Sequence, residues 1–276
     1  MKLHMPQRKS KLGKVDSNLK VILEEVERSD ADLVIFPELF LTGYVIKDDT
    51  RSHALELDSE PVKAIVDAAK DHGRTVIFGM PEKSSRIRGQ VHNTSVVAFP
   101  DGHVEAYRKI HMVNFGPFEE WQFFSPGKDL TMINVGGFRI GLIICYDLFF
   151  PELCRAYALA GADAVIGISA SPSVTGPFFE KVMTARAIEN TIYYIFSNML
   201  GTEGDLVFWG GCQVVGPRGE VRVRGKDLEE DDVITELDAE ELRVARTYRP
   251  TIRDARLDVC EALVDSLKIA LVDQKE

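Results

Sequence analysis

Residues 138–168 read FRIGLIICYDLFFPELCRAYALAGADAVIGI, and this stretch decides the fold class. The apolar run 138–144 predicts a buried strand, and residues 164–168 predict a second one. Between them, Pro151 begins a predicted helix that extends to Leu159 and stops at Gly161. An apolar strand followed by a helix and another strand is typical of an α/β fold.

The same alternation continues on both sides of this stretch, but hairpins interrupt it. The turn sequences at 100–102 and 136–137 each lie between two short apolar runs. Hairpins combined with βα units favour two packed sheets with helices outside over a purely parallel sheet. Further strands are predicted at 3–7, 33–36, 75–79, 92–99, 104–107, 132–135, 192–197, 212–215, 221–224 and 233–237. Further helices are predicted at 16–28, 59–69, 180–190 and 254–271, with Asp16 and Ser59 as caps of the first two.

No repeat, low-complexity tract or linker divides the chain, so we predict a single domain over residues 1–276, with 254–276 as a C-terminal helix and tail. The composition, 45% hydrophobic and 28% charged, is that of a globular protein. A net charge of -10 argues against a nucleic-acid partner. The sequence shows no signal peptide and no membrane span, and four scattered cysteines suggest neither disulfides nor a metal site. We therefore expect a soluble, cytoplasmic protein.

Three chemically useful side chains follow predicted strands directly. Cys145 follows the run 138–144, Glu38 follows 33–36 and Pro37, and Lys109 follows 104–107 and Arg108. Side chains at the carboxyl ends of strands face clefts, where binding and catalytic groups gather. Each residue also has an ordinary interpretation: a small buried thiol, a solvated carboxylate and a strand-end lysine. Spacing alone does not favour Lys109 over its neighbours Arg108 and His111.

Together, the three groups form a coherent set for cleaving an amide. Cys145 would supply the nucleophile, and Glu38 would take the thiol proton and pass it to the leaving nitrogen. Lys109 and the backbone N–H of Tyr146 would stabilise the oxyanion.

Three motifs resemble those of the nitrilase superfamily, in the same order. The glutamate motif is similar to Phe36-Pro37-Glu38 with Thr42-Gly43-Tyr44, the lysine motif to Tyr107-Arg108-Lys109-Ile110-His111, and the cysteine motif to Cys145-Tyr146-Asp147 with Phe150-Pro151-Glu152. The resemblance continues through Arg186-Ala187, Glu189-Asn190, Asn198, Gly210-Gly211 and Pro217-Arg218-Gly219, so that it spans nearly the whole chain.

This resemblance implies a four-layer α-β-β-α sandwich with two mixed sheets packed face to face. It also implies a cysteine–glutamate–lysine triad that works through a thioester, releases ammonia or an amine, and uses no cofactor or metal. Glu120 matches a second family glutamate that orients Lys109 and the substrate, whereas Glu119 is expected to be an exposed neighbour. Members commonly form dimers and larger homo-oligomers.

Departures from the family pattern bear on the substrate. Several branches carry arginine where this chain has Phe149, which weakens the case for a carboxylate-anchored substrate. Tyr146-Asp147 replaces the Trp-Glu of true nitrilases and favours amide or carbamoyl substrates over nitriles. We predict that Tyr44, Tyr146, Phe149, Phe150 and Ser171 line a pocket for a small, fairly apolar group. Cys154 and Cys212 are interpreted as packed, nonreactive thiols.

Hydrolysis of a small linear amide is the leading hypothesis, with N-carbamoyl amines and nitriles as alternative substrates. A nitrilase-like binding or regulatory module without turnover is the non-enzyme alternative. A papain-type pair with His111 or His92 as the base is a further alternative. Helices 151–159 and 254–271 carry more apolar surface than solvated helices need. That surface would serve either a homo-oligomer or packing on the chain's own sheet.

Overall fold

The structure, a computed structural model, describes residues 1–273, with fourteen strands and eight α-helices in that range. The strands are β1 (Lys2–Gln7), β2 (Leu33–Ile35), β3 (Thr75–Lys83), β4 (Val91–Ala98), β5 (Val104–Arg108), β6 (Met132–Val135), β7 (Phe138–Ile144), β8 (Ala164–Ser169), β9 (Tyr193–Asn198), β10 (Leu200–Glu203), β11 (Leu206–Trp209), β12 (Gln213–Val215), β13 (Val221–Arg224) and β14 (Asp231–Glu236). The helices are α1 (Val15–Arg28), α2 (Thr50–His53), α3 (Glu60–His72), α4 (Glu120–Phe123), α5 (Pro151–Leu159), α6 (Gly176–Asn190), α7 (Ala239–Tyr248) and α8 (Leu257–Asp273).

Two six-stranded mixed sheets form the centre of the molecule. The first has the order β14-β1-β2-β3-β4-β5, and the second has the order β13-β12-β9-β8-β7-β6. Within the first sheet β1, β2 and β3 run parallel, and within the second β7, β8 and β9 do so. The remaining pairs in both sheets are antiparallel. The predicted mixture of βα units and hairpins is confirmed.

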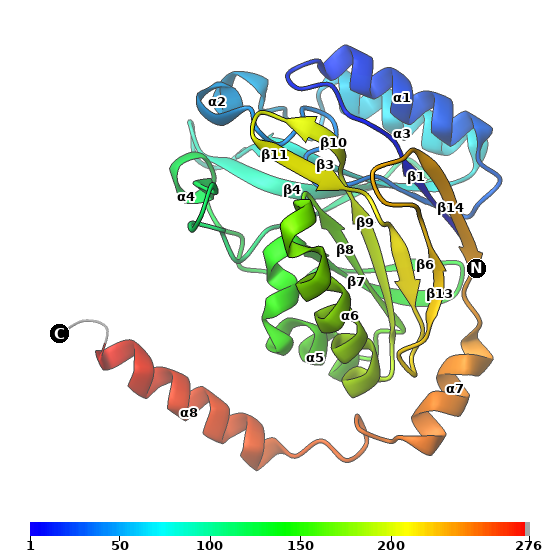
Figure 1. Cartoon of the computed structure of the whole chain (residues 1–276), viewed down its shortest axis with the longest axis vertical. Helices are drawn as coiled ribbons and strands as arrows, with labels where there is room; N and C mark the ends of the chain where they lie inside the picture. The colour runs from blue at the N-terminus through cyan, green and yellow to red at the C-terminus, as the bar shows by residue number, and fades with distance from the viewer. Residues whose placement is uncertain (274–276) are drawn as a thin grey trace.

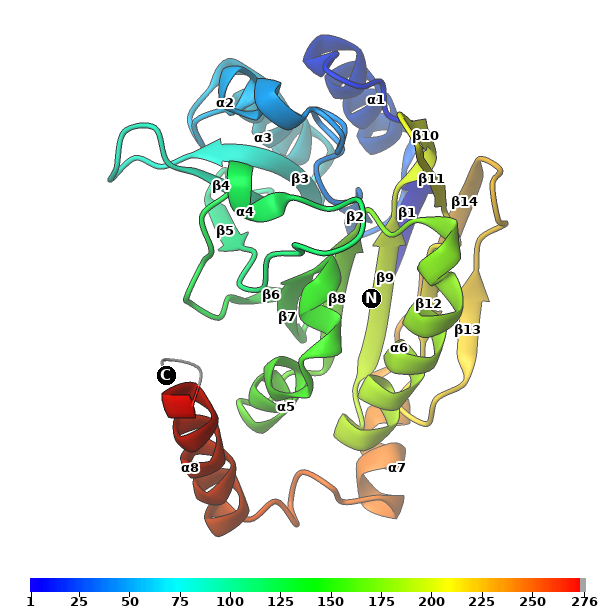
Figure 2. The same cartoon turned by 60° about the vertical axis from the view of Figure 1, so that its left-hand side comes forward.

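Three hydrophobic clusters separate four layers. The inner faces of both sheets share one cluster, which contains Leu3 and Ile77 from the first sheet and Ile140 and Ile166 from the second. α1 and α3 cover the outer face of the first sheet, while α5 and α6 cover that of the second (Figures 1 and 2). The α-β-β-α sandwich predicted from the sequence is confirmed.

Alternation along the strands explains this layering. In β3, Val76 and Phe78 face α1 and α3, whereas Ile77 between them faces the second sheet. In β8, Val165 faces the outer helices and Ile166 faces the inner cluster. Strands that bury both faces read as continuous apolar runs, which is why these strands were readable in the sequence.

Several local predictions were wrong or incomplete. Helix α1 begins at Val15 with Lys14 as its N-cap, so Asp16 lies in the first turn instead of capping it. Ser59 does precede α3, but its side chain caps no backbone N–H. The sequence interpretation missed the hairpin β10–β11 and the helices α2, α4 and α7. The start of helix α7 could have been predicted from an N-cap residue, because the Asp238 side chain accepts a hydrogen bond from the backbone N–H of Glu240.

Helix α8 differs from the other long helices because it stands away from the sandwich (Figures 1 and 2). All residues from 253 to 271 are exposed, including Leu263 (52%) and Leu267 (58%). Packing on the chain's own sheet therefore does not explain its apolar side chains. Helix α5, in contrast, buries Leu153 and Tyr157 against the second sheet. No helix within residues 1–273 has the length and apolar character that a bilayer crossing requires. The single-domain organisation over 1–276 stays a prediction.

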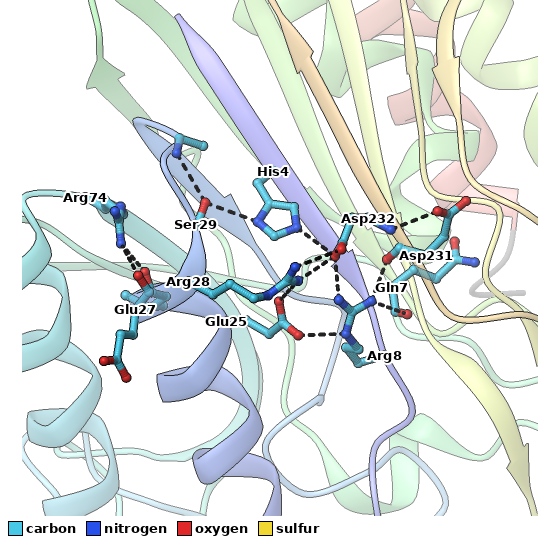
Figure 3. A network of polar contacts seen from close by, with 12 residues as sticks. His4, Gln7, Arg8, Glu25, Glu27, Arg28, Ser29, Arg74, Asp231 and Asp232 are labelled. Carbon is cyan, nitrogen blue, oxygen red and sulfur yellow. Dashed lines mark hydrogen bonds and ion pairs between the residues drawn. The ribbon is translucent and has the colours of Figure 1, made fainter.

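An ion-pair network joins β1, α1 and β14 (Figure 3). Asp232 accepts hydrogen bonds from Arg8 and Arg28, and these guanidinium groups also bind Glu25. His4 Nε2 lies 3.2 Å from the Asp232 carboxylate, and burial lowers the pKa of His4. The network fastens the first helix to both the first and the last strand of its sheet.

Candidate active site

The three predicted catalytic residues all follow strands of the two packed sheets. Glu38 lies three residues beyond β2, Lys109 follows β5 directly, and Cys145 follows β7 directly. Cys145 begins the short 3-10 helix Cys145–Phe149 and has a left-handed φ of 49°. A non-glycine residue in this region marks a sharp turn, which here ends the strand and presents the thiol.

Lys109 is completely buried and forms two ion pairs. Its Nζ donates to Glu38 Oε1 at 2.9 Å and to Glu120 Oε1 at 2.7 Å. Glu38 is also fully buried, and Glu120 is 3% exposed. Because a buried ammonium is costly without partners, two carboxylates at hydrogen-bond distance account for its position.

Two further donors fix the Glu38 carboxylate. Asn93 Nδ2 donates to Oε1 and the backbone N–H of Ala170 donates to Oε2, each at 2.7 Å. Gly79 of β3 makes room for this loop, since a Cβ there would stand 2.2 Å from the backbone nitrogen of Leu39. Glu38 is therefore held by contributions from both sheets.

Glu120 holds Lys109 from the other side. Its Oε1 also accepts the Tyr44 hydroxyl at 2.7 Å, and its Oε2 accepts the backbone N–H of Val113 at 3.0 Å. Glu119 is exposed, as the sequence comparison expected of a neighbour without that role. The predicted set of Glu38, Lys109 and Glu120 thus lies in one buried hydrogen-bonded group.

Burial and mutual charge shift the pKa of each group at this site. Burial raises the pKa of Glu38, and the Lys109 charge opposes that shift. Burial by itself would lower the pKa of Lys109, but Glu120 and Glu38 hold it well above its ordinary value. Burial, followed by the Glu38 charge, raises the pKa of Cys145. The resting state is therefore a neutral thiol beside an ion-paired carboxylate of raised proton affinity.

Asp147 stabilises the turn that carries Cys145. This buried carboxylate accepts the backbone N–H groups of Ile144 and His111, at 3.1 and 2.9 Å, and the Tyr107 hydroxyl at 2.7 Å. His111 Nδ1 also lies 2.8 Å from Asp147. The carboxylate therefore connects the strand end before Cys145 to the segment that follows Lys109.

The papain-type alternative requires a histidine that is hydrogen-bonded to the Cys145 thiol. Both candidate histidines contact other groups instead. His111 contacts Asp147, and its ring stacks on Phe150 with centroids 3.4 Å apart. His92 Nδ1 lies 2.8 Å from the backbone oxygen of Ser125. Across residues 1–273 neither imidazole forms a hydrogen bond with Cys145.

A cavity of about 330 Å³ opens beside Cys145. Four of the five residues predicted to contact substrate line it, namely Tyr44, Tyr146, Phe149 and Ser171. Phe150 does not, so that prediction was wrong: its ring instead stacks on His111. The other lining residues are Val113, Phe115, Phe118, Pro172, Thr175, Phe178 and Phe179.

Sequence reasoning missed three residues that organise this site. Asn93 holds Glu38, and Asp147 holds the nucleophile turn. Glu203, at the end of β10, accepts the backbone N–H groups of Tyr44 and Val45 at 2.8 and 2.9 Å. Asp147 belongs to the quoted cysteine motif, so its position was available, whereas Glu203 lies in a hairpin that no periodic pattern marks.

Other polar and sulfur groups belong to the framework. His4, Glu25 and Asp232 lie close enough together to hold a metal ion, but the guanidinium groups of Arg8 and Arg28 already pair with the two carboxylates. Cys154 and Cys212 are buried, which raises their pKa values to about 12 and about 11. At neutral pH both remain thiols, as expected for packed cysteines.

Comparison with known proteins gives a consistent result. Residues 3–247 match the carbon-nitrogen hydrolase family model. The chain is 33% identical to an (R)-stereoselective amidase from a Pseudomonas species, over 93% of this chain and 92% of that one. It is 32% identical to a nitrilase from Pyrococcus abyssi, over 80% of this chain and 82% of the relative.

Similar solved structures include one with a covalent adduct at its active-site cysteine. One of them is a mutant amidase from Nesterenkonia that carries the acetamide moiety of fluoroacetamide, added covalently at its active-site cysteine. It is 28% identical, has a TM-score of 0.81, and the match covers 95% of this chain and 96% of that one. The family match, the relatives and the shared fold together show that this chain belongs to the carbon-nitrogen hydrolase family, within the nitrilase superfamily, and is an enzyme.

Proposed function

We propose that this enzyme hydrolyses small linear amides through a thioester on Cys145. The observation that carries the proposal is the buried arrangement of Lys109 between Glu38 and Glu120, next to a neutral thiol at the cavity. A cysteine nucleophile needs a nearby base, and Glu38, with its raised pKa, is a suitable one.

In the first half-reaction, the Cys145 sulfur bonds to the amide carbonyl carbon while Glu38 takes the thiol proton. Lys109 Nζ and the Tyr146 N–H stabilise the oxyanion of the tetrahedral intermediate. Glu38 then gives its proton to the nitrogen, the C–N bond breaks, and ammonia leaves a thioester behind. Water attacks the thioester with Glu38 as the base, which releases the carboxylic acid and restores the thiol.

The decisive experiment compares the parent enzyme with Cys145→Ala on a panel of amides. We expect ammonia release by the parent, a covalent acyl adduct on Cys145 by mass spectrometry, and neither in the variant. Turnover that persists in Cys145→Ala, with an unchanged unfolding temperature, would contradict the mechanism. Measuring carbon dioxide and ammonia together separates amides from N-carbamoyl substrates.

We propose further that the enzyme works as a homodimer or larger homo-oligomer in the cytoplasm, without a cofactor, metal, nucleic-acid or membrane partner. The exposed apolar side chains of α8 support self-association, since they gain no burial from their own chain. The expected partner is therefore a second copy of the same chain.

A further inference from the structure

We infer that the cavity beside Cys145 selects amides whose acyl group is neutral and apolar, and rejects acyl groups that end in an ionised carboxylate. This inference rests on the proposed amide hydrolysis, and it names the substrate class of the same site.

The cavity wall offers no cation to an acidic acyl group. Among residues 1–273, the lining contains no lysine, arginine or histidine, and eight of its twelve side chains are aromatic or prolyl. A carboxylate moved into such a wall would lose its hydration without gaining an ion pair, and that is strongly unfavourable. Phe149 contributes an apolar ring to this wall, and the ring packs edge-on against Phe179 with centroids 5.2 Å apart.

Three of the four hydroxyl groups on the lining residues already have partners within the protein. Ser171 Oγ lies 2.6 Å from Thr175 Oγ1, which also contacts the backbone oxygen of Pro172 at 2.8 Å. The Tyr44 hydroxyl donates to Glu120. A substrate carboxylate would have to break these contacts to recruit any of these three hydroxyls, whereas an apolar group leaves them intact.

The nearest ammonium is not free to bind a carboxylate either. Lys109 already has Glu38 and Glu120 as its partners, so the buried group carries a net negative charge. An anionic acyl group would meet that excess charge at close range in a weakly screening environment. Both the cavity wall and the buried charged group beneath it therefore disfavour the binding of anionic substrates.

The mouth of the cavity extends the apolar surface. Phe115 and Phe178 line the cavity and are still 55% and 61% exposed. They would cover a branched or aromatic acyl group that reaches out from the thiol. Burying such a group excludes water from carbon surface on both partners, which favours binding.

A matched pair of substrates tests the inference. Glutaramate and 5-methylhexanamide share the amide and the three-methylene spacer, but one ends in a carboxylate and the other in an isopropyl group of similar shape. We expect kcat/KM to be at least about 100-fold higher for 5-methylhexanamide. A ratio near one, or a preference for glutaramate, would overturn the inference while leaving amide hydrolysis intact. Hydrolysis of neither substrate, nor of any other amide in the panel, would instead overturn the proposed function.

A charge placed at the mouth provides the second measurement. Phe178→Arg adds a cation at an exposed lining position, so we expect it to reduce the 100-fold preference by about tenfold or more. Val174→Arg is the matched control, because Val174 is 78% exposed and does not line the cavity. An equal substrate ratio in the two variants would refute the electrostatic basis of the selection.

Discussion

Glu120→Gln is the most informative perturbation of the buried group because it removes a charge and keeps the side-chain shape. Three donors converge on Glu120: Lys109 Nζ and the Tyr44 hydroxyl on one oxygen, and the Val113 N–H on the other. Glutamine has one acceptor oxygen, so its NH2 group must face either Val113 or the other two donors. At least one hydrogen bond is lost, and a donor is left against a donor.

The magnitude follows from that unmatched contact. A buried donor left without an acceptor costs about 1–3 kcal/mol. If the whole cost is expressed in the transition state, kcat/KM falls by about 5- to 150-fold. Thermal stability falls less than it would for an isolated buried pair, since Lys109 keeps Glu38 as a partner.

The pH dependence of kcat/KM in Glu120→Gln gives a prediction with a definite direction. The Glu120 charge raises the pKa of Glu38, so its removal lowers that pKa. Because the reaction needs ionised Glu38, the acid limb of kcat/KM should move to lower pH in Glu120→Gln. The measurement is ammonia release across the acid range, with exposed Glu119→Gln as the matched control. An acid limb that stays fixed or moves to higher pH would refute the reasoning.

Three further perturbations test other parts of the molecule. Asp232→Asn should cost about 1–2 kcal/mol in urea unfolding at pH 7, a figure already discounted because the side chain is 34% exposed. Its arginine partners hold the pKa of Asp232 below the ordinary range, so the loss of stability in the variant should shrink below about pH 4. As a control, the exposed Asp30→Asn should leave the free energy of unfolding unchanged. A loss of stability that persists in acid would contradict the role of the Asp232 charge. Replacing Leu263 and Leu267 together by Asp should yield a monomer in light scattering at an unchanged unfolding temperature, and an equally monomeric parent would rule out assembly through α8. Glu203→Ala should lower kcat/KM about tenfold, because it releases the backbone of the Tyr44 loop. Glu203→Gln should keep kcat/KM near that of the parent, because one amide oxygen can accept both N–H groups. Identical rates in the two variants would show that this loop needs no anchor.

The sequence predicted the parts of the site that lie at the ends of buried strands. Glu38 and Cys145 follow apolar runs that are readable because both faces of β2 and β7 are covered, whereas Lys109 follows the half-buried strand β5 and was identified through its motif. Motif order then joined the three residues, although they are far apart in the chain. Strand ends and local motifs are short-range signals, which is why this part of the prediction succeeded.

The contacts that hold these residues could not be predicted in the same way. Asn93 reaches Glu38 from an internal position of β4, and Glu203 reaches the Tyr44 loop across 159 residues of sequence. Neither contact has a periodic pattern, because each depends on how the two sheets meet. Phe150 was misplaced for a related reason: its neighbour His111 comes from another segment and offers the ring on which it stacks.

The buried ion pairs of Lys109 with Glu38 and Glu120 have a consequence for how charge moves during the reaction. In the resting site, one ammonium, two carboxylates and a neutral thiol sum to a single negative charge. After the proposed attack, Glu38 is neutral and the oxyanion is negative, so the sum is the same. The reaction moves charge within the protein without changing its total, and the surrounding dipoles need little rearrangement while the bond forms.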